Sequence, residues 1–171
     1  MPTAMTALAK YTVGSGGTPN ITFSSISNAH TDLLLLVSVR TESSGGQMRM
    51  RFNSSTDSSY NRVKLYGDNS SPAGGVETGL TYFEYIDVAN SNYTSTTYTN
   101  VKIYIPNYAG SLRKVFSVDS GDPNRAGAGY TEMHAGIRTN TSAITSIELS
   151  MNNSADFEQH TTAYLYGITN S

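Results

Sequence analysis

The chain has 171 residues, and its 11 basic and 13 acidic side chains leave a formal net charge of −2. Serine, threonine and asparagine together account for 58 residues, about a third of the sequence. The lack of cysteine excludes disulfides, thiolate metal sites and cysteine nucleophiles, and the near-neutral charge argues against a protein that coats nucleic acid.

Alternation of apolar and polar residues recurs along the chain with a period of two, which is typical of β-strands rather than helices. In the clearest case Met48, Met50 and Phe52 are expected to face a core while Arg49 and Arg51 face outward. About ten strands are predicted, from candidate segments at residues 7–13, 20–27, 32–42, 47–52, 59–67, 79–89, 101–105, 112–118, 130–138, 147–151 and 161–168. In the segment 112–118, Lys114 interrupts an otherwise apolar face.

The segments between these strands are rich in turn-forming residues, and they include 72–75 and 121–124. Short, evenly spaced strands without helices predict one all-β domain, an antiparallel jelly-roll β-sandwich over residues 21–171. Residues 1–20 are expected to form an N-terminal arm with a first strand, and residues 1–6 a loose end. The start of the chain lacks the basic and apolar regions of a signal peptide, and the longest strongly apolar run, residues 33–37, is too short for a membrane helix.

The sequence contains no nucleophile elbow and no glycine-rich phosphate-binding motif, so we expect no enzyme and no cofactor. The three histidines are far apart in sequence, which gives no metal-ligand spacing. The segment Asp119–Asn124 brings acid and amide oxygens close together. Calcium prefers such oxygen ligands, but an ordinary turn explains the same residues. We therefore predict no catalytic residue and no metal site, and leave calcium at this segment open.

Charge is unevenly distributed along the chain. Five basic and two acidic residues lie between residues 40 and 64, whereas three acidic residues and no basic residue follow Arg138. Two interpretations are open. Either the oppositely charged segments meet within the fold, or they dock between copies of the chain.

Tyrosine is the most informative residue type, with 12 copies. An exposed tyrosine can stack on a sugar ring or anchor a protein interface, whereas a buried one fills the core. Candidate interface or glycan contacts are the tyrosines of three predicted strand regions together with two arginines: Arg49, Arg51, Tyr104, Tyr108, Tyr164 and Tyr166.

Residues 48–53, 105–109 and 163–168, in their order and spacing over roughly residues 20–168, resemble virion proteins of tailed bacteriophages. Residues 48–53 form a strand that ends in Arg-Phe-Asn and leads through a polar loop to Tyr60. Residues 105–109 are similar to the I-x-x-Y-A strand of these proteins, and residues 163–168 look like their terminal L-Y-G-I hairpin. The loop 53–57 lacks the glycine often found there, so no loop function is carried over.

The resemblance implies a jelly-roll protein displayed on a phage head or tail. We expect a capsid decoration, or cement, protein that contacts the major capsid protein and copies of itself as a homotrimer, with no nucleic-acid or membrane partner. Such a protein is located in the virion and assembles in the bacterial cytoplasm. The alternative is a receptor- or carbohydrate-binding domain of a phage fibre, whose partner is a host-surface glycan.

Overall fold

This computed structural model describes residues 4–68, 71–125 and 128–170, with the backbone alone for residues 122–125 and 128. The described residues contain twelve antiparallel strands. The strands are β1 (Ala4–Thr12), β2 (Asn20–Phe23), β3 (Asp32–Val39), β4 (Gln47–Phe52), β5 (Tyr60–Gly67), β6 (Ala73–Leu80), β7 (Phe83–Asp87), β8 (Thr99–Ile105), β9 (Lys114–Arg125), β10 (Ala128–Arg138), β11 (Ile147–Met151) and β12 (Thr162–Thr169).

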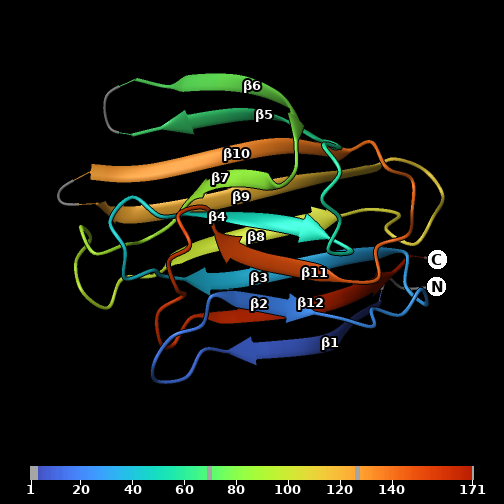
Figure 1. Ribbon diagram of the computed structural model, residues 1–171, viewed down its shortest axis with the longest axis horizontal. Coiled ribbons are helices and arrows are strands. Elements are labelled where there is room, and N and C mark those ends of the chain that lie inside the picture. The colour runs from blue at the N-terminus through green and yellow to red at the C-terminus, as the bar shows by residue number, and fades with distance from the viewer. Residues whose placement is uncertain (1–3, 69–70, 126–127, 171) are drawn as a thin grey trace.

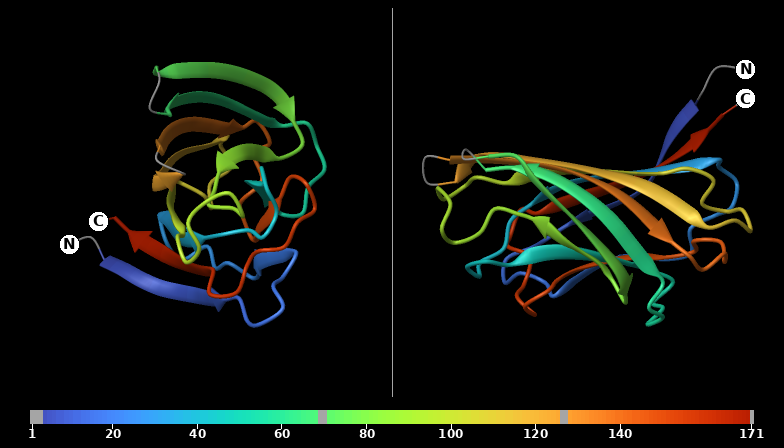
Figure 2. Two further views of the ribbon diagram at one scale, coloured as in Figure 1. Left: turned by 90° about the vertical axis from the view of Figure 1, so that its left-hand side faces the viewer. Right: turned by 90° about the horizontal axis from the view of Figure 1, so that it is seen from above.

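The strands pack as two unequal layers (Figure 2). The large sheet has eight strands in the order β1-β12-β3-β8-β9-β10-β5-β6, and the small sheet has four in the order β2-β11-β4-β7 (Figure 1). The all-β sandwich predicted from the sequence is thereby confirmed, while the jelly-roll connectivity stays a prediction.

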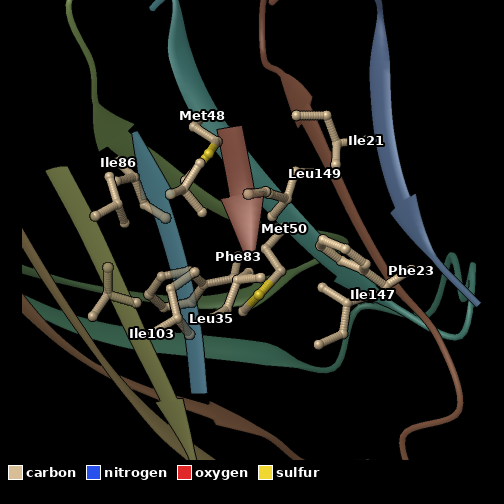
Figure 3. Packing of buried hydrophobic residues seen from close by; sticks show 14 of the residues in the cluster. Ile21, Phe23, Leu35, Met48, Met50, Phe83, Ile86, Ile103, Ile147 and Leu149 are labelled. Carbon is tan, nitrogen blue, oxygen red and sulfur yellow. The ribbon is translucent and has the colours of Figure 1, made fainter. Parts of the chain in front are cut away.

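The core lies between the two sheets and follows the predicted alternation. Met48, Met50 and Phe52 are fully buried, as expected. Figure 3 shows Met48 beside Ile86 of β7 and Met50 near Leu35 of β3, all within the buried cluster. Burying side chains of this size contributes roughly 1.5–3 kcal/mol each, so this layer is the main source of stability.

Two predicted turns are wrong. Residues 73–75 begin β6 instead of forming a turn, because they pair with residues 64–66 of β5. Residues 121–124 continue β9. Beyond Gly121 this strand pairs with β10 but no longer with β8, and a proline is tolerated in a strand that has one side unpaired. The loose N-terminal end is wrong for residues 4–6, which pair with β12 as part of β1.

Lys114 is buried, and its ammonium group is held by backbone carbonyls of two loops. Its Nζ donates to the carbonyl of Gly110 at 2.6 Å, to that of Thr141 at 3.1 Å, and to that of Leu112. Burial, and then the nearby charge of Arg138, lower the pKa of Lys114. The lysine that interrupts the apolar face thus has a structural role at the start of β9.

The difference in width between the sheets leaves one edge of the large sheet only partly covered. Seen face-on, β5 and β6 extend past the small sheet, whose last strand is β7 (Figure 1). We call the side of the large sheet that faces the small sheet its inner face, and the opposite side its outer face. This edge contains the candidate site.

Candidate functional site

The side chains of β5 and β10 are inverted with respect to the usual pattern of a sandwich. Their buried inner positions include charged residues, among them Arg62, Lys64 and Glu132. Their exposed outer positions include Leu65 and Met133, which lie opposite each other in the register. Apolar side chains therefore face outward where a sandwich normally has polar ones.

The outer apolar residues form one continuous area, which we call the outer patch. It consists of five side chains that are 50–70% exposed: Val63, Leu65, Val76, Val115 and Met133. The register makes them neighbours, because Val76 pairs with Val63, Leu65 with Met133, and Val115 with the adjacent Ile137. Contiguous exposed apolar surface of this kind commonly marks an interaction site.

Three of the predicted tyrosines lie on the same outer face as this patch. Tyr104 lines a shallow apolar groove with Val63 and Val115, and its hydroxyl donates to Asp32 at 2.7 Å. Tyr164 and Tyr166 are stacked on β12, with ring centroids 6.4 Å apart. Leu34, half-buried on β3, pairs with both Tyr104 and Tyr166. The tyrosines and the outer patch therefore form one face.

Tyr108 does not belong to this face. It is fully buried, and its hydroxyl donates to the carbonyl of Ser27. The prediction of Tyr108 as an interface or glycan contact is therefore wrong, because this tyrosine fills the core.

The two predicted arginines lie elsewhere, on the outer face of the small sheet. The guanidinium carbons of Arg49 and Arg51 lie 4.0 and 4.8 Å from the ring centroid of Tyr82. Arg49 also donates to Ser150 Oγ, and Arg51 pairs with Glu148. The six predicted residues therefore do not form a single site.

The oppositely charged segments meet within the fold. Arg40 Nε lies 2.6 Å from Glu158 Oε2, and Arg51 Nη2 lies 2.7 Å from Glu148 Oε1. Each pair joins the basic segment before residue 64 to the acidic segment after Arg138. The first of the two interpretations is supported, and these charges do not require a second copy.

The charged residues beneath β5 and β10 form a connected network, which we call the inner cluster. Its members are Arg62, Lys64, Asp87, Glu132 and His134. Lys64 Nζ lies 2.6 Å from Glu132 Oε2 and 3.1 Å from Asp87 Oδ2, while His134 Nε2 lies 3.2 Å from Glu132 Oε2. Burial alone lowers the pKa of Lys64, but the hydrogen bond and charge of Glu132 outweigh it and raise that pKa overall.

The remaining contacts of Glu132 hold it in place. Its Oε1 accepts from the backbone N–H of Asp87 at 2.7 Å and from Ser120 Oγ at 3.1 Å. Since the Glu132 side chain has no exposed surface, it organises the cluster and does not face solvent. A buried ion network is costly to maintain compared with apolar packing, which makes this region a candidate for function.

No metal-binding group of three or more His, Cys, Asp or Glu side chains occurs among the residues that the structure describes. In the open calcium candidate, Asp119 pairs with Lys102 at 2.8 Å, while the side chains of 122–124 lie outside the described residues. In the same part of the chain, no helix has the length and apolar character needed to cross a membrane.

The inner cluster was not predicted, although the sequence contains a signal for it. Arg62 and Lys64 alternate with apolar residues in one strand, and Glu132 and His134 do so in another. Opposite charges at alternate positions of two strands fit a shared face. What the sequence does not give is the pairing of these strands, or which face the small sheet covers.

No protein-family model matches the chain, and a search of curated proteins finds no match. Function is therefore inferred from geometry and from the residues themselves.

Proposed function

We propose that the chain is a structural protein of a bacteriophage virion, a decoration protein that binds the head exterior through the outer patch. The single observation that carries the proposal is the inverted polarity of β5 and β10. Five large apolar side chains remain in water in the isolated chain, and a partner surface would remove them from it.

The charge of the surrounding face favours a protein partner. Lys102 and Asp119 lie at the border of the patch and neutralise each other at 2.8 Å. An apolar patch bordered by a neutralised ion pair suits an apolar surface of a protein subunit rather than a phosphate backbone. The proposed partner is the major capsid protein, and the proposed state of the chain is a homotrimer.

Stabilisation of the head follows from linkage. A protein that binds the assembled shell and not its free subunits shifts the equilibrium toward the shell by mass action. One standard interface buries about 1,600 Å², and the repeated contacts on a symmetric shell multiply the gain.

The test uses phage heads prepared without the chain and then mixed with the purified protein. The wild-type chain is expected to sediment with the heads. The double variant Leu65→Lys/Met133→Lys is expected to bind at least about tenfold more weakly, since two lysines replace the centre of the patch.

Met5→Lys is the matched control, because Met5 is 59% exposed on β1 at the opposite edge of the same sheet. Binding of the double variant at wild-type strength would contradict the proposal, as would wild-type protein that associates with tails alone. Mass measurement in solution tests the trimer, and a monomer at high concentration would rule it out.

A further inference from the structure

A shallow cavity of about 310 Å³ lies on the inner face of the large sheet, above the inner cluster. Its walls come from five strands, with Gln47 of β4 and Tyr130 of β10 among the lining residues. It lies at the border of the small sheet, where β5 and β6 extend past β7. The volume is at the lower end of the range typical of small-molecule sites.

Aromatic rings form part of the wall. Tyr66 and Tyr130 are stacked, with centroids 5.6 Å apart and planes at 22°. Lys64 Nζ lies 5.0 and 5.4 Å from these two centroids, and Arg62 lies 4.8 Å from the ring of Tyr85. The rings are thus held by cations that are themselves fixed. A tyrosine combines an apolar face with a polar hydroxyl, which suits the C–H face and hydroxyl edge of a pyranose.

Carboxylates on the cavity wall supply acceptors for hydroxyl groups. Asp87 Oδ1 accepts from Gln47 Nε2 at 2.9 Å, and Asp87 Oδ2 accepts from Lys64 at 3.1 Å. Glu77 is paired with Arg62 on the neighbouring wall. A carboxylate offers about four acceptor positions, so both groups are fixed in place and retain capacity for sugar hydroxyls. Their side chains are 25% and 40% exposed.

The charge balance selects the ligand class. Arg62 binds Glu77 through two nitrogens, at 2.9 and 3.2 Å, and Lys64 is bound by Asp87 and Glu132. The positive charges of Arg62 and Lys64 are therefore both neutralised by carboxylates. An anionic ligand would have to displace one of these pairs, whereas a neutral polyhydroxyl ligand would not.

Gly75 keeps the cavity open. It pairs with Lys64 across the β5–β6 ladder and lines the cavity, and a Cβ placed there would meet no atom within 4 Å. From the tyrosine wall, the acceptors, the charge balance and this open position, we propose that the cavity binds a neutral pyranose unit of a glycan.

The experiment measures binding of the methyl glycosides of glucose, galactose and N-acetylglucosamine to the full chain by saturation-transfer NMR and titration. We expect at least one of them to bind with a dissociation constant in the millimolar range or tighter. Gly75→Leu is expected to weaken that binding about tenfold or more without lowering the melting temperature, because the new side chain enters open space.

Gly121→Leu is the matched control, since Gly121 also lies in open space but on β9 outside the cavity. Tyr66→Ala is a second test, which removes one ring of the stacked pair and is expected to abolish binding. The inference is overturned if none of the three glycosides binds, or if Gly75→Leu binds as well as Gly121→Leu. Head binding by Gly75→Leu should stay normal, so this result and that of the docking test are independent.

Discussion

The two halves of the large sheet place their apolar and charged side chains on opposite faces. In the half made of β12, β3 and β8, apolar residues such as Leu35 and Ile103 face the small sheet, and Lys102 faces outward. In the half made of β10 and β5, charged residues face inward, and Leu65 and Met133 face outward. Both halves alternate with a period of two, so the alternation defines two faces but not which of them is covered. What covers each face decides its polarity.

The largest expected effect comes from placing a charge on each side of this comparison. Met50 is fully buried between the sheets, so Met50→Asp buries an unpaired carboxylate and should cost more than about 4 kcal/mol, which prevents folding. Met133 is 62% exposed, and Met133→Asp should cost less than about 1 kcal/mol, mainly from repulsion by Asp119 directly opposite in the register. Solubility and thermal unfolding of the two variants test this contrast. A soluble Met50→Asp protein with unchanged melting would refute the assignment of β4.

A smaller effect is expected from breaking the inner cluster. Lys64→Met leaves Glu132 buried without its main partner and should cost about 3–5 kcal/mol in denaturant unfolding. Lys64→Met/Glu132→Gln removes both charges, while the amide oxygen of the introduced glutamine can still accept from the backbone N–H of Asp87. The double variant should therefore recover about 1–3 kcal/mol of this loss. A double variant no more stable than Lys64→Met would show that the pair does not act as a unit.

Tyr60, at the start of β5, provides a pH-dependent test at the contact between the large sheet and β4 of the small sheet. Its hydroxyl accepts from the backbone N–H of Phe52 at 2.7 Å, so Tyr60→Phe leaves that buried donor unpaired and should cost about 1–3 kcal/mol. Burial raises the pKa of Tyr60 to about 12, above its ordinary value near 10 in the unfolded chain.

Because the pKa of Tyr60 is raised in the folded chain, the free energy of unfolding falls as the pH rises. The contribution of Tyr60 is complete below pH 10 and is lost as the pH rises toward 12, because only the unfolded chain then releases the proton. Between these values the stability of the wild type should fall about 1.4 kcal/mol per pH unit more steeply than that of Tyr60→Phe. Equal slopes in urea unfolding across this range would remove Tyr60 as the source.

The smallest effect is expected for an ion pair that is exposed, in contrast to the buried pair of Lys64 and Glu132. Lys102 and Asp119 lie 2.8 Å apart, but their side chains are 49% and 39% exposed. Lys102→Met should therefore change the free energy of unfolding by less than about 0.5 kcal/mol, and added salt should reduce even that. A loss as large as that of Lys64→Met would mean that burial does not separate the two pairs.

The sequence was sufficient where local pattern and tertiary environment agree. The alternation in residues 47–52 and 101–105 places the same side chains in the core as the structure does. It failed at residues 73–75, because two glycines after a proline indicate a turn unless a neighbouring strand pairs with them. Only the β5–β6 ladder, which is a non-local contact, turns this segment into a strand.

The candidate site was less predictable than the fold. Tyr104, Tyr164 and Tyr166 share one face, but nothing in the sequence separates them from Tyr108, which the structure buries. The outer patch depends on which face of β5 and β10 is turned toward the small sheet, and strand order is a property of the whole chain. Residues of the patch therefore look like core residues until the topology is known.

The loop closure by Lys114 has a practical consequence for chemical labelling. Of the four lysines, Lys10 and Lys102 are exposed, whereas Lys64 and Lys114 are buried with their ammonium groups held by oxygen acceptors. An amine-reactive reagent should modify the first two rapidly and reach Lys114 only when the carbonyls around it separate. The rate at which Lys114 acquires the label, read by mass spectrometry, therefore measures how fast the sandwich opens at the start of β9.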